Sequence, residues 1–291
     1  MSDAYKDALI SKITSREDVN HCWNVLEQSD PRSSEWNYYV PTYNATLWTL
    51  LFVADINYAP AKPRFLKPLS IISDYFYDKK NGIFSIGKSH FPIPCLNGNM
   101  LYLHTYFESG NDEVVDTTIA FFNKYQRFDD GGYKTPSEYP YFSNKSCYGK
   151  HSCYWGIVKL LKGLSFIPKD KRTKDARELS EKCIDFILKH KVCYSSKGSG
   201  AYLHKNIELL TFPNMYQADF LEILWLLKRE DVRSKEMDRA LELLKSKMDE
   251  NENWNIENAI KRLVILFGKR TNGNDLVSER AREVYDHYFG K

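Results

Sequence analysis

Apolar side chains recur at every third or fourth position along most of the chain, and segments with this spacing follow one another in pairs. This spacing places apolar side chains on one face of an α-helix, and the strict alternation typical of strands is nearly absent. The sequence therefore predicts an all-α protein. The expected helical segments span 19–26, 45–54, 65–76, 96–107, 114–125, 154–166, 176–188, 216–227, 237–248, 260–267 and 277–288.

Turns rich in glycine or asparagine separate the two helices of successive pairs, and each turn ends in an aromatic residue. The closing aromatics are Phe84, Tyr133, Tyr202 and Trp254, which lie 49, 69 and 52 residues apart. A period of roughly 50 residues with one insertion is typical of repeated helix-turn-helix units. Glycine allows a positive φ after a helix end, so the aromatic side chain can fold back over the helix pair.

The two helices of each pair differ in polarity. Segments 174–179 and 233–238 have a charged face, as outer helices need, whereas segments 45–51, 153–158 and 218–227 carry few charges and are expected to be buried. About five to six such hairpins would form either an open solenoid or a closed α/α barrel, also called a toroid. The short termini and the absence of a polar capping repeat favour the closed form. We expect one α/α-toroid domain over 1–291, with an outer helix in 1–34, the repeat core in 35–270 and a closing outer helix in 271–291.

Metal-ligand types gather at the predicted starts of the inner helices. If these helices are parallel, their N-termini meet at one end of the barrel. Zinc is bound by about four thiolate, imidazole or carboxylate groups, and a helix N-terminus also favours a thiolate. Metal-free thiol chemistry at Cys153, or simple core packing of Cys153 with His151 as a helix cap, would use the same residues. The predicted zinc ligands are Cys95, Cys147, His151, Cys153 and Asp219.

Asp129 and Asp130 form a second carboxylate feature, directly before Gly131 and Gly132. Adjacent carboxylates can share a proton and act as an acid, or hold a divalent cation such as magnesium. The same sequence is also ordinary turn chemistry, in which an aspartate side chain accepts hydrogen bonds from nearby amides. We take Asp129, Asp130, Cys153 and Asp219 as the candidate catalytic residues.

Aromatic residues make up 14% of the chain, with 20 Tyr, 16 Phe and 6 Trp. Such a composition indicates either a very aromatic core or a cavity lined with rings. Ring faces bind apolar ligands, sugars or cationic intermediates. The candidate pocket residues are Tyr43, Tyr154, Trp155, His204, Tyr216 and Trp225.

Charge and hydropathy limit the classes of partner. Lys and Arg total 41 against 38 Asp and Glu, a net charge of +3, and no long basic run suggests nucleic-acid binding. No apolar run reaches the ~18 residues of a membrane span. The N-terminal residues lack the order of a signal peptide, so we expect a cytoplasmic protein with its six cysteines as thiols, metal ligands or core residues rather than disulfides.

The repeat, the glycine-aromatic turns and the segment 149–156 together resemble the terpenoid cyclase/protein prenyltransferase α/α-toroid superfamily. The stretch from 95–100 through 126–132 to 151–155 is similar to small prokaryotic members with prenyltransferase and squalene-oxidase-type repeats, and the likeness covers about 35–267. The resemblance implies a zinc held by Asp, Cys and His at the tops of inner helices. His151, Cys153 and Asp219 match these residue types but not their order.

The chain also departs from parts of that superfamily. It has no Asp-x-Asp-Asp run, which proton-initiated cyclases use, and it holds one toroid where triterpene cyclases carry two. A protein-modifying prenyltransferase would need a helical-repeat partner subunit. Fold likeness by itself does not establish a reaction.

Three functions follow as hypotheses. The first is a prenyltransferase- or terpene-cyclase-like enzyme, a transferase or lyase, acting on an isoprenoid or other apolar substrate in an aromatic-lined toroid cavity with a zinc or thiolate centre at its mouth. The second is a non-catalytic toroid that binds a protein or lipid. The third is a carbohydrate-active α/α-barrel enzyme, in which Asp129 or Asp130 would act with Asp219 or Glu257 across a cleft.

Overall fold

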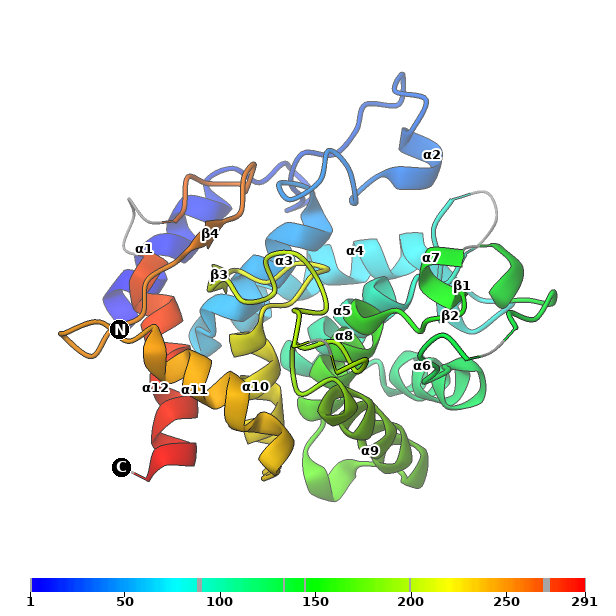
Figure 1. Ribbon diagram of the computed structural model, residues 1–291. Coiled ribbons are helices and arrows are strands. Elements are labelled where there is room, and N and C mark those ends of the chain that lie inside the picture. Colours follow the sequence, from blue (N-terminus) through cyan, green and yellow to red (C-terminus); the bar gives the residue numbers. More distant parts are fainter. Residues whose placement is uncertain are drawn as a thin grey trace.

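The structure is a computed structural model that describes residues 2–87, 91–132, 134–143, 145–198, 200–268 and 273–290. These residues form twelve α-helices, four short 3-10 helices and four strands of two residues each, so the prediction of an all-α protein is confirmed (Figure 1). The longer helices are α1 (Asp3–Thr14), α3 (Thr46–Ile56), α4 (Leu66–Phe76), α5 (Pro94–Tyr106), α6 (Asp112–Tyr125), α8 (Tyr154–Ser165), α9 (Lys174–Lys189), α10 (Phe220–Arg229), α11 (Asp238–Ser246) and α12 (Gly273–Phe289).

The remaining elements are short. The helices α2 (Ser33–Trp36) and α7 (Lys145–Tyr148) are single turns, and the 3-10 helices are Ala59–Phe65, Tyr141–Ser143, Lys169–Lys171 and Lys235–Met237. Strand β1 (Tyr77–Asp78) pairs antiparallel with β2 (Ile83–Phe84) around a turn at Gly82, whose φ is +64°. Strand β3 (Thr211–Phe212) pairs parallel with β4 (Asn258–Ala259).

Helices α5 and α8 pack against each other in parallel, with glycine at the points of contact. Along the two helices Pro94 meets Gly156, then Gly98 meets the backbone of Lys159, then Leu101 meets Gly163. The contacts advance in the same direction on both helices, which shows that they are parallel. A Cβ placed at Gly98 would lie 2.4 Å from the carbonyl carbon of Lys159, so only glycine permits this approach.

Five helices, α3, α5, α8, α10 and α12, meet around a buried cluster of polar side chains, and we call them the inner helices. Each contributes one or two members: Asp55, Tyr102, Lys159, Lys162, Glu222 and Arg280, all at most 7% exposed. The Lys162 ammonium lies 2.7 Å from Asp55 and 2.8 Å from Glu222, and the Lys159 ammonium lies 2.6 Å from Glu222. Paired charges and the Tyr102 ring therefore fill the space between the inner helices.

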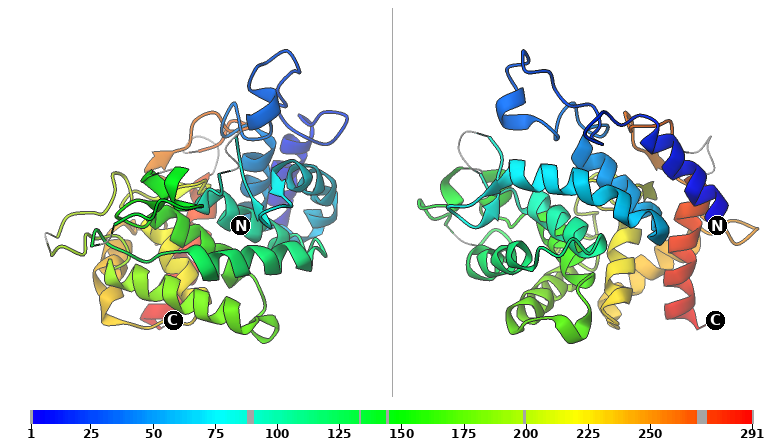
Figure 2. Two further views of the ribbon diagram at one scale, coloured as in Figure 1. Left: turned by 90° about the vertical axis from the view of Figure 1, so that its right-hand side faces the viewer. Right: turned by 180° about the vertical axis from the view of Figure 1, so that it is seen from behind.

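Amphipathic helices alternate with the inner helices along the chain. Helix α9 buries Ala176, Leu179, Cys183 and Ile187 and exposes its charged face, as predicted for an outer helix. An ion pair of 2.8 Å between Lys6 and Glu279 joins α1 to the first half of α12, and the two helices meet at the same edge of the molecule in Figure 1 and in the right-hand view of Figure 2. The first and the last helix of the chain are thereby joined.

Three of the expected segments differ from the structure. Residues 19–26 form turns, because the Asp18 carboxylate accepts hydrogen bonds from the amides of Asn20 and Cys22, and His21 has a φ of +62°. Residues 260–267 are not helical either, since Arg262 has a φ of +59°. The segment 277–288 was expected to be an outer helix, but α12 packs beside α10 and carries Arg280 into the buried cluster.

Candidate functional site

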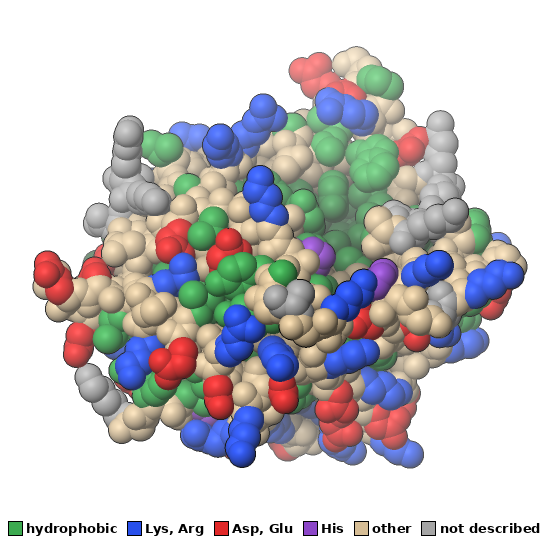
Figure 3. Space-filling model, in the orientation of Figure 1, with side chains coloured by type: hydrophobic (Ala, Val, Ile, Leu, Met, Phe, Trp, Pro, Cys, Tyr) green, Lys and Arg blue, Asp and Glu red, His purple; other side chains and the backbone are tan. Residues whose placement is uncertain are grey.

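A hollow lined by hydrophobic side chains opens on the face shown in Figure 3, between the segment that carries α2 and the segment around α7, with histidine side chains at its edge. Trp48, Cys95 and Trp155 lie in the first turns of α3, α5 and α8. The parallel packing of α5 and α8 brings the N-terminal ends of these two helices to one side of the molecule.

Four aromatic side chains pack together at the start of α3. The Tyr43 and Tyr216 rings stack at 6.5 Å, and Trp48 contacts Tyr43 at 5.5 Å, Tyr39 at 4.9 Å and Tyr216 at 6.4 Å between centroids. The Trp48 indole N–H donates to the Tyr39 carbonyl oxygen at 2.8 Å, which fixes the ring. Trp48 is buried, and the three tyrosines are partly exposed. They offer ring faces and hydroxyl groups to a ligand.

A second aromatic group lies at the start of α8. The Trp155 ring contacts the His204 imidazole at 4.5 Å, and a small cavity has both Trp155 and Tyr43 in its wall. Burial lowers the pKa of His204, and the neighbouring His190 lowers it further. Trp155, His204, Tyr43 and Tyr216 thus belong to one region. Tyr154, however, is buried, and its hydroxyl group donates a hydrogen bond to the Val192 carbonyl oxygen. It is therefore a packing residue next to the site.

Three of the predicted ligands, Cys95, Cys147 and Cys153, come together beside the tyrosines. A hydrogen bond links the Cys147 and Cys153 side chains, and electrostatic interactions connect Cys95 with both. Burial raises the pKa of Tyr39, and the nearby Cys95, Tyr43, Tyr216 and Cys147 add to this increase. Thiols and aromatic rings therefore share one site.

The three thiols differ in acidity. The hydrogen bond from Cys147, together with the backbone amides of Gly156 and Trp155, lowers the pKa of Cys153 to about 7 although burial opposes the shift. The same hydrogen bond and burial raise the pKa of Cys147. Burial raises the pKa of Cys95 to about 12. Cys153, which precedes α8 as its N-cap residue, is therefore the thiolate of the group.

This difference predicts a pH profile for alkylation. The rate at which iodoacetamide modifies Cys153 should rise with pH and reach half its maximum near pH 7, because only the thiolate reacts. In Cys147→Ala the midpoint should move up toward the ordinary value of about 8.5, since the hydrogen bond is lost. Peptide mass spectrometry at each pH separates Cys153 from the other cysteines. A wild-type midpoint above that ordinary value, or no change in Cys147→Ala, would contradict the assignment.

The two other predicted zinc ligands lie elsewhere. The His151 ring is 3.3 Å from the Asp130 carboxylate and packs on Gly131, because backbone pairing of residues 150–152 with 129–131 holds it there. Asp219 is buried at the start of α10. Its carboxylate accepts hydrogen bonds from the backbone amides of Glu222 at 2.7 Å and Thr211 at 2.6 Å. Burial raises the pKa of Asp219 to about 7, against these two hydrogen bonds. The prediction that these five residues form one centre is wrong.

Within the described ranges, no three His, Cys, Asp or Glu side chains are arranged so that they could hold a metal ion. The predicted zinc set does not fit the geometry, since the imidazole and the carboxylate are bound to other partners. The predicted magnesium site at Asp129 and Asp130 does not fit either. The Asp129 carboxylate forms an ion pair with Arg127 at 2.6 Å. The Asp130 carboxylate accepts a hydrogen bond from the Ser196 hydroxyl group and lies 3.7 Å from the Lys189 ammonium.

Asp129 and Asp130 do not act as one acid, because their carboxylates face different partners. Burial favours a higher pKa for Asp130, but the hydrogen bond from Ser196 and the charges of His190, His151 and Lys189 outweigh it and lower the pKa. The carboxylate holds the 129–131 turn against α9 and the 194–202 segment. Its role in the structure is that of a turn anchor.

Trp225 was expected in the pocket but lies at the opposite end of the inner helices. Its indole N–H donates to Glu283 at 3.1 Å, and its ring lies 4.6 Å from the Arg280 guanidinium. Sequence reasoning missed Tyr39 and Trp48. Trp48 stands in an apolar segment that predicts burial, and Tyr39 precedes the helix without any local signal that it faces the hollow.

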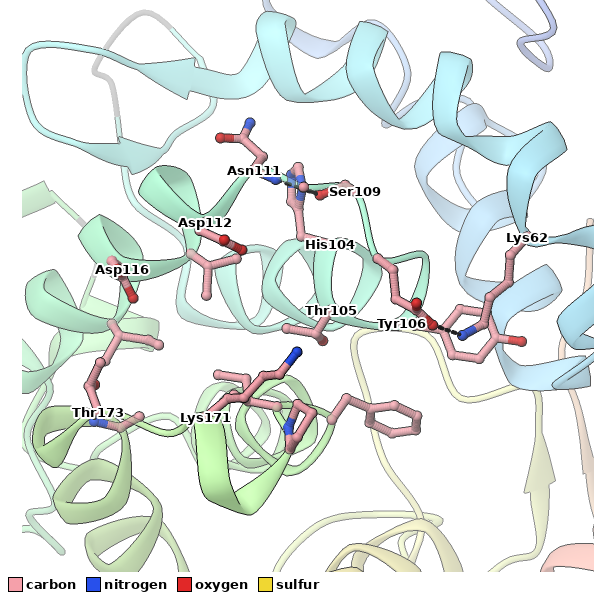
Figure 4. Close-up of a pocket in the computed structure, with 18 of the residues that line it drawn as sticks. Lys62, His104, Thr105, Tyr106, Ser109, Asn111, Asp112, Asp116, Lys171 and Thr173 are labelled. Atoms are coloured by element: carbon pink, nitrogen blue, oxygen red, sulfur yellow. Dashed lines mark hydrogen bonds and ion pairs between the residues drawn. The ribbon is translucent and has the colours of Figure 1, made fainter.

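A separate groove of about 780 Å³ lies at the C-terminal end of α5, bordered by the start of α6 and the segment before α9. Figure 4 shows Asp112 and Asp116 on one side of this space and Lys171 on another. His104 at its base bonds to Ser73 and Ser109, and burial lowers the pKa of His104 to about 4, so it remains neutral. His104 is therefore a hydrogen-bonded core residue.

No protein-family model matches the chain, and no curated protein resembles it closely enough to count as a match. In the described part of the chain, no helix is long and apolar enough to cross a membrane.

Proposed function

We propose that the chain is a closed α/α toroid of the kind found in terpenoid cyclases and protein prenyltransferases. The parallel course of the inner helices supports this, as does the alternation of inner and outer helices along the chain. In this arrangement the hairpins are α1–α3, α4–α5, α6–α8, α9–α10 and α11–α12. The contact between α1 and α12 would close the toroid.

We further propose that the protein is an enzyme that acts on an isoprenoid or another apolar substrate in the hollow. The observation that carries this proposal is the convergence of Tyr43, Trp48, Tyr216 and Trp155 with the Cys153 thiolate at one end of the inner helices. Ring faces bind apolar chains and stabilise positive charge, and a thiolate is a strong nucleophile. The group-transfer class is favoured over proton-initiated cyclisation, because Asp129 and Asp130 are held by other partners.

The buried cluster limits where the substrate can lie. Lys159 and Lys162 with Asp55 and Glu222 fill the space below the hollow and are fully buried. A long apolar chain placed there would remove the charges from their partners at a cost of several kcal/mol. The substrate would therefore rest in the hollow against the tyrosines.

A non-catalytic toroid that binds a lipid or a protein would use the same aromatic surface without the thiolate. Binding that is unaffected by Cys153→Ala together with no detectable turnover would favour that alternative. The carboxylates that the carbohydrate hypothesis names are bound to other partners. Asp219 caps α10, and Glu257 is bound to Lys247 at 2.6 Å and to the Leu210 amide at 2.9 Å.

The ligand hypothesis predicts a loss of affinity in Tyr216→Ala. Removing the ring that stacks on Tyr43 should weaken binding of an isoprenoid diphosphate or alcohol about tenfold, which corresponds to ~1.4 kcal/mol. Tyr202→Ala is the matched control, because this ring stacks on Tyr194 and is 40% exposed. Intrinsic tryptophan fluorescence titration measures both, with an oligosaccharide as the comparison ligand. Equal losses in the two variants, or tighter binding of the oligosaccharide, would contradict the proposal.

A further inference from the structure

Cys147 and Cys153 face each other across a tight turn. An antiparallel bridge joins Tyr148 to Ser152, so the next pair outward in that register is Cys147 with Cys153. The hydrogen bond between the two side chains already places their sulfur atoms in contact, so a small change in this short turn would bring them to bonding distance.

The two thiols are chemically unequal and both are reachable. The Cys147 side chain donates a hydrogen bond to the Cys153 sulfur, and the first amides of α8, a helix of 12 residues, help to lower the pKa of Cys153. The side chains of Cys147 and Cys153 are partly exposed, whereas Cys22, Cys95, Cys183 and Cys193 are buried. A partly exposed thiolate next to a second thiol is the usual arrangement of a redox-active pair.

We propose that Cys147 and Cys153 form a reversible dithiol–disulfide pair that is oxidised by a low-molecular-mass disulfide. The Cys153 thiolate attacks one sulfur of the disulfide, so a mixed disulfide forms at Cys153 and one thiolate leaves. Cys147, after losing its proton to solvent, attacks the Cys153 sulfur and releases the second thiol. One disulfide bond is broken and one is made, and two thiols are released for each pair oxidised.

Oxidation would change the hollow directly. It converts the nucleophile of the proposed enzyme into one half of a disulfide and leaves Cys95 as the remaining thiol beside the tyrosines. The inference concerns the thiol pair and holds for any ligand of the hollow. It adds control by the thiol–disulfide balance to the proposed function.

The test begins with the full chain in reduced form, freed of reductant and exposed to glutathione disulfide. We expect the intact mass to fall by two hydrogen atoms and a digest to contain one peptide cross-linked between Cys147 and Cys153. Cys147→Ser should stop at the mixed disulfide, with one glutathione on Cys153. Cys153→Ser should react at least ten times more slowly. Cys183→Ala is the control, since this buried core thiol should leave the reaction unchanged.

Several outcomes would overturn the inference: a stable mixed disulfide in the wild type, a cross-link between other cysteines, or wild-type rates in Cys153→Ser. Isoprenoid binding is measured on the same reduced samples. Disulfide formation without isoprenoid binding would refute the proposed function and leave the thiol pair standing. Isoprenoid binding without disulfide formation would refute the thiol pair and leave the proposed function standing.

Discussion

Replacing Lys162 by methionine should lower the free energy of unfolding by about 3–5 kcal/mol. The Lys162 ammonium bridges Asp55 at 2.7 Å and Glu222 at 2.8 Å, and all three side chains are fully buried. Its removal leaves the buried Asp55 and Glu222 carboxylates with less positive charge to neutralise them, although Lys159 and Arg280 remain nearby. Urea denaturation followed by circular dichroism measures the loss.

Lys62→Met is the matched control for this substitution. Lys62 also lies 2.8 Å from a carboxylate, but its partner Glu108 has a side chain that is 78% exposed. Solvent screens such a pair, so the loss should stay below about 1 kcal/mol. Similar losses in the two variants would show that the buried cluster does not hold the inner helices together.

Replacing Gly98 by alanine should also destabilise the protein strongly, by about 1–3 kcal/mol or more. The added methyl group would lie 2.4–2.6 Å from backbone atoms of Lys159 and Leu160, so α5 and α8 would have to move apart. Backbone atoms cannot turn aside as a flexible side chain does. Thermal and urea unfolding measure the effect.

Gly132→Ala provides the comparison, because no atom lies within 4 Å of a Cβ placed there. This variant should unfold within about 0.5 kcal/mol of the wild type. If Gly98→Ala proved equally mild, the close parallel packing of α5 and α8 would be wrong. That result would also remove the strongest support for the toroid.

The two substitutions, at Lys162 and Gly98, change contacts between helices. The sequence predicts the helices but not these contacts. The apolar spacing predicts α5 and α8 as buried helices, and it places Gly98 and Gly163 within them. It does not show that the glycines of one helix meet the backbone of the other, because that contact joins residues about 60 positions apart. Lys159 and Lys162 interrupt an otherwise apolar segment, and only their partners on α3 and α10 explain why they are buried.

The sequence indicated only part of the candidate site, because it shows where helices start but not where individual side chains point. Parallel inner helices bring their starts together, so Cys95 and Cys153 meet as expected. The direction of each side chain depends on local backbone pairing, which turns His151 toward Asp130, and on capping, which holds Asp219 against two amides. Tyr39 and Trp48 enter the site because segments before and within α3 fold over the start of α5.

The amino-acid sequence by itself determined that the chain is helical, that helices with a charged face alternate with apolar ones, and that thiols and rings stand near the apolar helix starts. These properties follow from the helical period and from the cost of burying unpaired charge, which both act locally. Only the tertiary structure decided that α12 is an inner helix, that paired charges fill the centre, and that Cys147 opposes Cys153. Those features depend on distances between segments far apart in the chain, and such distances are set by packing rather than by local spacing.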